Sequence, residues 1–327
     1  MATPNAKPSS DDIMTVVANA LEEIGFMVPD RTRARDVAKV LGFMLMQNPL
    51  RLTLPPGKAS MLQASLLWLT GSPMVDTSLL RSLVGVWIWA ASLNRVHLSI
   101  PSTVFKFIDN FFSHRVPWWA SARKEIKLMA YTVASLVHHL ALPSPSLIFA
   151  TDAEGANHLD CGGWGIVATH ADRPLLEKCF AAGNQTGCTI ARLDGSFKHL
   201  KDPLKEMAAR IPISKIPKDL MADPKRWAAL WHGRWKHSEH ITLGEGRTTN
   251  ILLEHLVSLP EAHSHRIMSL CDNMPWCMAT TKGRSPTYRL NVLLRRRSAL
   301  LLASGIQMPH PWMDTARMPA DSLSRRH

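Results

Sequence analysis

Four acidic residues in the second half of the chain, Asp152, Glu245, Asp272 and Asp321, are the strongest candidates for chemistry. Each has an ordinary structural explanation by itself, because acidic residues commonly form turns at strand ends and cap helices. Their order points further: acid after a strand, acid on a helix, acid after a later strand, acid on the last helix. Carboxylates gathered in one place repel one another unless they hold divalent cations. The pattern therefore favours a two-metal phosphoryl-transfer site.

Short apolar runs that suit buried strands precede both aspartates. The first covers residues 147–152 and ends at Asp152, and another covers residues 266–271 and ends next to Asp272. Residues 161–167 predict a second strand, paired with the first through a loop that contains Gly and Asn. Because reactive groups gather at strand ends in mostly parallel sheets, we expect these strands to position the two aspartates.

Helices are expected around these strands. The apolar spacing predicts helices over residues 248–259 and 285–304, and a short helix over residues 319–325. Residues 306–313 are predicted to form the last strand, and the two prolines in it restrict it to a sheet edge. Strands that alternate with helices place this half of the chain in the α/β class.

The first half has a different pattern. Residues 12–24 predict a helix, residues 40–54 look extended, and residues 58–142 show mostly helical spacing. A Pro-Ser-Pro sequence separates this half from the next. We therefore divide the chain into an N-terminal lead-in and helix (1–28), a mostly helical region (29–143) and an α/β region (146–327).

Motifs in the α/β region resemble those of the ribonuclease H domain of retrotransposon reverse transcriptases. The matching segments are Phe149-Ala150-Thr151-Asp152-Ala153 with Gly163-Trp164-Gly165, then His240-Ile241-Thr242-Leu243-Gly244-Glu245, Leu270-Cys271-Asp272-Asn273 and Met318-Pro319-Ala320-Asp321-Ser322-Leu323-Ser324-Arg325. The closing Pro-Ala-Asp-x-x-Ser-Arg is characteristic of that family, and so is Gly-Arg-Ser at 283–285. The resemblance covers residues 146–327.

The resemblance implies a fold, a reaction and a cofactor. The fold is ribonuclease H-like, with a mixed five-stranded sheet flanked by helices. The reaction is endonucleolytic hydrolysis of RNA in an RNA–DNA hybrid, with two Mg²⁺ ions as cofactor and Mn²⁺ as a substitute. By position, Asp152, Glu245, Asp272 and Asp321 match the catalytic, metal-binding acids of the family.

The helical region is similar, more loosely, to the part of such reverse transcriptases that leaves the polymerase palm and enters the thumb and connection. Residues 40–45, 54–58 and 80–87 carry this similarity. Fingers and most of the palm are not found in the sequence, so we expect no polymerase activity from this chain alone. Asp11 and Asp12 are interpreted as charges at the start of the first helix, with a relic of the polymerase site as the alternative.

Two glycines depart from the family pattern. Gly244 and Gly246 flank Glu245 where the family has helix-forming residues, and each costs a helix roughly 1 kcal/mol relative to Ala. The long gap between Asp152 and Glu245 also implies an insertion. These departures leave an alternative open: a catalytically inactive, nucleic-acid-binding remnant of a reverse transcriptase. A purely structural domain is a third possibility.

Basic residues outnumber acidic ones, with 38 Lys and Arg against 26 Asp and Glu and a net charge of +12. This balance permits a polyanionic partner, and the expected one is an RNA–DNA hybrid. The best candidate patch combines Lys282 and Arg284 with Arg295, Arg296 and Arg297. Its place after the third acid suits contacts with a phosphate backbone, although a run of charges is also typical of a solvated helix face.

Composition narrows the class of protein. The chain has 327 residues, of which 46% are hydrophobic and 20% charged, as in globular proteins. Its longest strongly apolar stretch, residues 83–93, is shorter than the roughly 20 residues that span a membrane, and residues 1–12 lack an apolar signal region. Five cysteines at irregular spacing indicate a reducing compartment, so we expect an intracellular protein, cytoplasmic or nuclear.

A cluster of histidines offers a weaker metal site. His232, His237 and His240 have no cysteine at zinc spacing beside them, so capping or solvent-facing roles suit them better. Cys271 and Cys277 are interpreted as buried thiols for the same reason.

Overall fold

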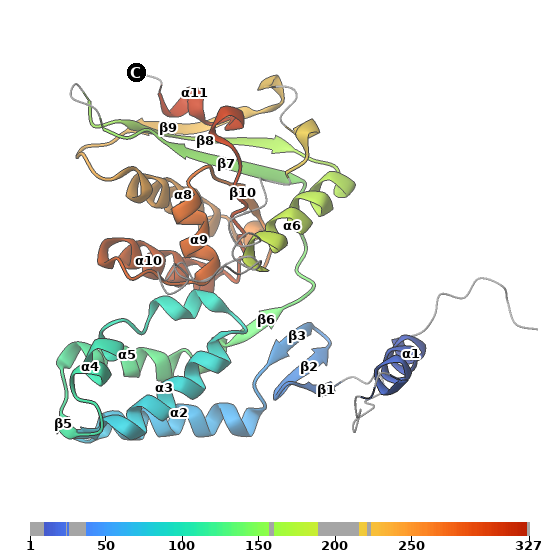
Figure 1. Cartoon of the computed structure of the whole chain (residues 1–327). Coiled ribbons are helices and arrows are strands. Elements are labelled where there is room, and N and C mark those ends of the chain that lie inside the picture. Colours follow the sequence, from blue (N-terminus) through green and yellow to red (C-terminus); the bar gives the residue numbers. More distant parts are fainter. Residues whose placement is uncertain are drawn as a thin grey trace, which may run out of the picture.

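The structure is a computed structural model, and it describes residues 10–23, 25, 37–156, 160–188, 216–220 and 224–325. Two regions make up most of it, each with its own hydrophobic core, before and after residues 143–146 (Figure 1). Helix α1 (Ser10–Glu23) lies away from both and contains Asp11 and Asp12 in its first turn (Figure 1). The domain boundaries at 28 and at 143–146 stay a prediction.

The N-terminal region packs helices beside a small antiparallel sheet of order β1-β2-β3-β6. The strands are β1 (Val37–Val40), β2 (Phe43–Gln47), β3 (Leu50–Thr53) and β6 (Val137–His139). The helices are α2 (Pro56–Gly71), α3 (Thr77–Ala91), α4 (Thr103–Asn110) and α5 (Ala120–Tyr131), with a two-stranded ribbon of β4 (Met74–Asp76) and β5 (Arg115–Pro117). At the centre of the core, the buried Trp87 indole donates a hydrogen bond to the Met129 carbonyl at 3.0 Å. The extended and mostly helical stretches predicted for this region are present.

The C-terminal region is built on a mixed four-stranded sheet of order β10-β7-β8-β9. Its strands are β7 (Leu147–Ala153), β8 (Gly163–His170), β9 (Ala228–Arg234) and β10 (Met268–Leu270). β8 pairs antiparallel with both β7 and β9, whereas β10 lies parallel to β7. The three apolar runs predicted as strands around the first two aspartates form β7, β8 and β10.

The predicted last strand, residues 306–313, is not a regular strand. The segment runs beside β10 with two isolated parallel bridges, at Gln307 and at Trp312. The carbonyls of Gln307, Pro309 and Pro311 accept hydrogen bonds from backbone N–H groups in and beside β10, at 2.8, 3.3 and 3.4 Å. A proline has no N–H to donate in return. The ladder is therefore one-sided along much of this edge, and four strands are regular within the described residues instead of the predicted five.

Helices cover both faces of this sheet (Figure 1). The elements are α6 (Arg173–Cys188), α8 (Ile241–Val257), α9 (Met274–Lys282), α10 (Tyr288–Ser304) and α11 (Asp321–Ser324). Successive side chains of a strand point to opposite faces, so Phe149 packs with α8 and α10, while Ile148 and Ala150 pack with α6 and α11. The result is a three-layer α/β arrangement, which confirms the predicted α/β class.

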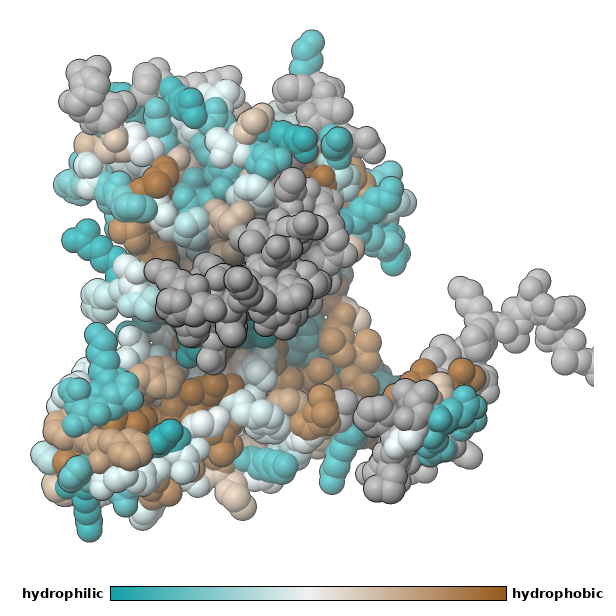
Figure 2. Space-filling model, in the orientation of Figure 1, coloured by the Kyte–Doolittle hydropathy of each residue, from teal (hydrophilic) through white to brown (hydrophobic). Residues whose placement is uncertain are grey.

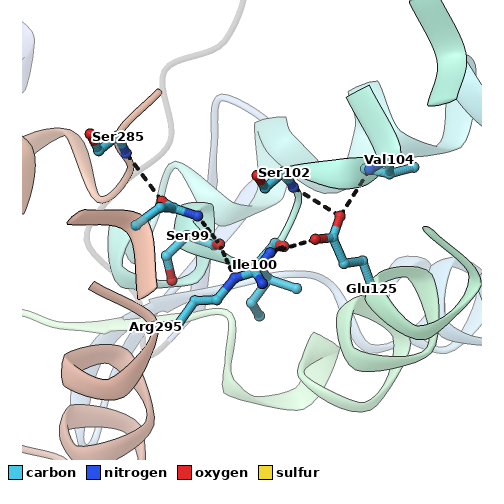
Figure 3. Close-up of polar contacts among 8 residues, drawn as sticks. Ser99, Ile100, Ser102, Val104, Glu125, Ser285 and Arg295 are labelled. Carbon is cyan, nitrogen blue, oxygen red and sulfur yellow. Dashed lines mark hydrogen bonds and ion pairs between the residues drawn. The ribbon is translucent and has the colours of Figure 1, made fainter. Parts of the chain in front are cut away.

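The two regions meet where α10 contacts the 3₁₀ helix η1 (Arg95–Ser99) (Figure 3). Arg295 of α10 forms an ion pair with Glu125 of α5 and donates to the carbonyls of Ser99 and Ile100, at 2.8 and 2.6 Å. The second carboxylate oxygen of Glu125 accepts hydrogen bonds from two backbone N–H groups at the start of α4, both at 2.9 Å. Glu125 is 5% exposed, so one buried carboxylate ties α4, α5 and α10 together. We refer to this network as the joint.

The surfaces of the two regions differ. In Figure 2 most of the apolar surface in view lies on the N-terminal region, at the bottom, and the exposed apolar side chains of that region include Met61, Trp68 and Val86. No helix in the described part of the chain is both long enough and apolar enough to cross a membrane.

Candidate functional site

The parallel register of β7 and β10 places two of the acids side by side. Ala150 of β7 lies opposite Leu270 of β10. Two residues beyond this pair come Asp152 and Asp272, at the same end of the sheet. Since neighbouring strands lie about 4.8 Å apart, the carboxyl groups of the two aspartates are close neighbours. The strand ends thus bring together the residues that the sequence pattern singled out.

The first turns of α8 bring Glu245 to the same place. One oxygen of its carboxyl group accepts a hydrogen bond from the backbone N–H of Ala153 at 3.3 Å, and the other lies 3.7 Å from the Cys271 thiol. Ligand atoms of Glu245, Cys271 and Asp272 all lie within 4.8 Å of one another. Glu245 is only 2% exposed, so its carboxyl group is enclosed against the strand ends.

The glycines that flank Glu245 do not displace it. α8 runs through both of them without a break. A Cβ atom at Gly246 would lie 2.9 Å from the Trp276 ring of α9, a contact that a side chain cannot make without movement. Close packing against Trp276 is therefore the physical reason for a glycine with poor helix propensity at this position, and this packing holds Glu245 near β7.

Asp321, the fourth acid, lies at the start of α11, and this helix packs against β8. Gly165 of β8 pairs with Asp152 of β7, and a Cβ atom at Gly165 would lie 2.8 Å from the backbone nitrogen of Ser324. Because Gly165 has no side chain, α11 approaches closely enough for the Ser324 hydroxyl to donate a hydrogen bond to Asp152. Asp321, at the start of α11, pairs with Arg325 at 2.7 Å. Its negative charge acts on both aspartates at the strand ends.

Burial and mutual repulsion raise the pKa values of Asp152, Glu245 and Asp272. Burial is the main reason that the pKa of Asp152 rises to about 7, and the charges of Asp272 and Asp321 act in the same direction. Burial also raises the pKa of Glu245 well above its ordinary value and raises that of Asp272. A contact with Glu245 partly offsets the rise in the pKa of Asp272. A bound cation would favour the ionised form of all of these carboxyl groups.

The donor set fits a hard divalent cation. Mg²⁺ and Mn²⁺ prefer carboxylate oxygens. Glu245 and Asp272 supply them within 4.8 Å of each other, and Asp152 and Asp321 lie outside this group but close enough for their charges to act on it. The thiol of Cys271 belongs to the cluster but does not suit these ions. Its hydrogen bond with Cys277 and its burial raise the pKa of Cys271 well above the usual range, so it stays a thiol and donates to Glu245.

Two hydroxyl groups that hold the aspartates were not singled out by the sequence pattern. The Ser324 hydroxyl bonds Asp152, and the Thr315 side chain forms a hydrogen bond with Asp272. Ser324 follows Asp321 by three residues, and this helical spacing, which places both on one side of a turn, was a usable signal. Thr315 carries no comparable signal, because its position depends on how the chain returns to the sheet.

Two of the predicted nucleic-acid-binding residues are engaged within the protein. Arg295 is half-buried and pairs with Glu125 at the joint. Arg297 is 4% exposed, and its guanidinium donates to the Met308 carbonyl at 2.6 Å. The interpretation of Arg297 as part of an exposed basic patch therefore does not hold, and the guanidinium of Arg295 is held at the joint.

The other three predicted basic residues are more accessible. Arg296 is exposed and pairs with Glu254 of α8 at 2.8 Å. Arg284 is exposed and Lys282 is half-buried, both at the end of α9, the helix that begins just after Asp272.

The histidine cluster has a structural role at the one position where a contact defines it. The ring of His240 accepts a hydrogen bond from the backbone N–H of Thr242 at 3.2 Å and so caps α8. The interpretation of His240 as a cap is thus confirmed. Cys271 and Cys277 are both buried free thiols, as expected.

No protein-family model and no curated protein matches this chain. Among solved structures, it is similar to the foamy viral protease-reverse transcriptase dRH in complex with double-stranded DNA, at 12% identity and a TM-score of 0.30, over 91% of this chain and 42% of that one. It is also similar to the foamy viral protease-reverse transcriptase in complex with an RNA/DNA hybrid, at 10% identity and a TM-score of 0.27, over 98% of this chain and 56% of that one. The chain thus spans about half the length of these proteins, and TM-scores this low do not establish a shared fold.

Proposed function

We propose that this protein is a metal-dependent nuclease that hydrolyses the RNA strand of RNA–DNA hybrids. The observation that carries the proposal is the gathering of Asp152, Glu245, Asp272 and Asp321 from four separate elements at one end of the sheet. Buried carboxyl groups with raised pKa values suit divalent cations, and paired divalent cations are typical of enzymes that cleave phosphodiester bonds. The resemblance of the motifs around these acids to retroelement ribonuclease H supports the choice of reaction.

Each acid has a distinct part in this proposal. Asp152 and Asp272 would hold cations at the adjacent strand ends, the enclosed Glu245 would be a further ligand, and Asp321, which is more exposed, would face the substrate. The Ser324 hydroxyl fixes the orientation of Asp152. Two Mg²⁺ ions, or Mn²⁺ in their place, supply the Lewis acidity that stabilises the attacking and leaving oxygens when bound.

Recognition of the hybrid is expected to depend on backbone shape and on 2′-hydroxyl groups. Lys282 and Arg284 are placed to contact phosphates, because both follow α9 and neither forms an ion pair within the described residues. We infer an intracellular protein, cytoplasmic or nuclear, related to the thumb, connection and ribonuclease H parts of a retroelement reverse transcriptase. No polymerase activity is expected from this chain alone.

A cleavage assay with two matched variants tests the proposal. Purified protein is incubated with a labelled RNA–DNA hybrid and Mg²⁺ or Mn²⁺, alongside Glu245→Gln and Glu254→Gln. Both glutamates lie on α8, but Glu254 is on the surface and pairs with Arg296. We expect Glu245→Gln to lower the cleavage rate by roughly 10³-fold, the size of effect that loss of a metal ligand produces, and Glu254→Gln to leave it unchanged.

Other outcomes decide between the alternatives. Absence of cleavage by the wild-type protein and both variants, with hybrid binding retained, would replace the nuclease by an inactive nucleic-acid-binding remnant. Equal loss of cleavage in both variants, with unchanged thermal unfolding, would show that the cluster is not the catalytic centre.

A further inference from the structure

A second site lies between the two regions, away from the carboxylates. A cavity of about 780 Å³ is enclosed by β3 and β6 of the N-terminal region and by α10 and residues 305–310 of the C-terminal region. Arg266, which precedes β10, lines this cavity, whereas Asp272 follows that strand. None of the four acids is among the residues that line it. The cavity is therefore a different site from the carboxylate cluster.

The walls of this cavity carry positive charge from both regions. Four arginines line it: Arg51, Arg95, Arg266 and Arg297. No Asp or Glu is among the described residues that line it. Three histidines also line the wall, and one of them, His310, is buried. Such a concentration of one sign of charge attracts anions into a partly enclosed space.

Two buried polar atoms in the wall lack a hydrogen-bond partner, and the buried guanidinium of Arg297 lacks a counter-charge. The guanidinium of Arg297 donates to the carbonyl and the sulfur of Met308 but faces no carboxylate among the described residues. The Nε atom of Arg51 and the Nε2 atom of His310 are buried without a hydrogen-bond partner in the described structure. His310 is 5% exposed, and its Nδ1–H donates to the Ser269 carbonyl at 3.0 Å, so its Nε2 atom donates to an anion once the ring is protonated. Unpaired buried polar groups of this kind cost folding free energy, and a ligand can satisfy them.

The pKa values of several groups in the wall are lowered by burial and, for the histidines, also by neighbouring positive charges. Burial lowers the pKa of His310 well below its ordinary value, and the charge of Arg297 acts in the same direction. Burial also lowers the pKa of His138 and of His139, with further lowering by Arg266 and Arg51 respectively. Burial lowers the pKa of Arg297 itself to about 9. A bound anion would offset all of these effects.

We propose that this cavity binds a small phosphate-bearing anion of nucleotide size. Arginine guanidinium groups match the geometry of phosphate oxygens and form paired hydrogen bonds with them. The volume lies within the range of about 300–1,000 Å³ typical of small-molecule sites, and the apolar side chains of Leu93 and Leu301 line part of the wall beside the charges. Because the walls come from both regions, the anion would also hold the two regions together.

Calorimetric titration of the full chain with tripolyphosphate tests this site. EDTA is present, so that no divalent cation can bridge tripolyphosphate to the carboxylates. The variants are Arg51→Gln in the cavity wall and Arg289→Gln, a matched control on the exposed start of α10 that does not line the cavity. We expect saturable binding by the wild-type protein, about tenfold weaker binding by Arg51→Gln from the loss of one charged hydrogen-bond donor, and unchanged binding by Arg289→Gln.

The results of these titrations either support binding of a small anion in this cavity or overturn it. If Arg51→Gln loses cooperative thermal unfolding, Arg95→Gln takes its place, because the Arg95 side chain is exposed at the wall. No binding by the wild-type protein, or equal weakening by the cavity and control variants, would overturn the proposal. Binding of a duplex of nucleic acid with the same dependence on Arg51, but no binding of tripolyphosphate, would replace the small anion by a phosphate backbone.

Discussion

The C-terminal region contributes to two sites of opposite charge. In one, carboxyl groups from β7, α8, α11 and the end of β10 lie close together, and in the other, arginines and histidines line a cavity shared with the N-terminal region. Both sites bury like charges, which costs folding free energy unless ligands of opposite charge bind. One region can therefore help to form a cation site and an anion site from separate sets of side chains.

The carboxylate cluster and the cavity are formed by different parts of the molecule. All four acids belong to the C-terminal region, where strand register and two close helix contacts fix their positions. The cavity takes its walls from both regions, so its geometry depends on the joint at Glu125 and Arg295. Changes at the joint should therefore disturb the anion site and leave the cation site intact.

The largest expected effect on stability is at Asp152. In the unfolded chain its carboxyl group ionises near pH 4, but its pKa in the folded chain is about 7. Between these values the folded protein holds more protons than the unfolded one, so stability falls as pH rises. Without divalent cations, Asp152→Asn should stabilise the protein by up to about 4 kcal/mol at pH 8 and by almost nothing at pH 4. Urea unfolding at both pH values measures this, and an equal effect at both would contradict it.

A smaller effect is expected at the joint. Glu125→Gln removes the ion pair with Arg295 and leaves that guanidinium partly buried, which should cost about 2 kcal/mol. Tripolyphosphate affinity should fall, because the cavity takes its walls from both regions. Mn²⁺ affinity should not change, because all four acids lie within the C-terminal region. Urea unfolding and the two titrations check this. An equal loss of affinity for tripolyphosphate and for Mn²⁺ would contradict a role of the joint in the anion site alone.

The smallest effect is expected where α11 meets β8. Gly165→Ala puts a Cβ atom 2.8 Å from the Ser324 backbone nitrogen and 3.0 Å from the Leu323 side chain, and overpacking of this kind costs about 1–2 kcal/mol. It should move the Ser324 hydroxyl away from Asp152 and weaken Mn²⁺ binding, with tripolyphosphate binding unchanged. Unchanged Mn²⁺ affinity, despite the loss of stability, would show that α11 does not help to form the cation site.

The sequence pattern was sufficient to predict the parts of the site that follow from the order of residues along single strands. Apolar runs that end in Asp152 and Asp272 predict strands, and strands have few ways to pair, so the two acids meet. The contacts of Arg295 and the burial of Arg297 were not predictable in this way. A run of three arginines has the same local pattern whether it faces water or another part of the protein. The packing of α10 against η1 decides this for Arg295, and its packing against Met308 decides it for Arg297.

Two further differences have physical causes beyond local pattern. Gly246 looks like a defect in a helix until Trp276 occupies the space that its side chain would take. Residues 306–313 have the apolar character of a strand, but Pro309 and Pro311 remove the donors that would complete the ladder. Both depend on what lies opposite the residue, which the linear sequence does not contain.

If the four acids gather to hold divalent cations, the protein binds Mn²⁺ at this cluster. Calorimetric titration at pH 6.5 in two buffers of different ionisation enthalpy gives both the affinity and the number of protons released. Because burial raises the pKa values of Asp152 and Glu245, we predict saturable binding with net proton release, lost in Glu245→Gln and retained in Glu254→Gln. Equal binding by both variants, or no binding by the wild-type protein, would contradict the account.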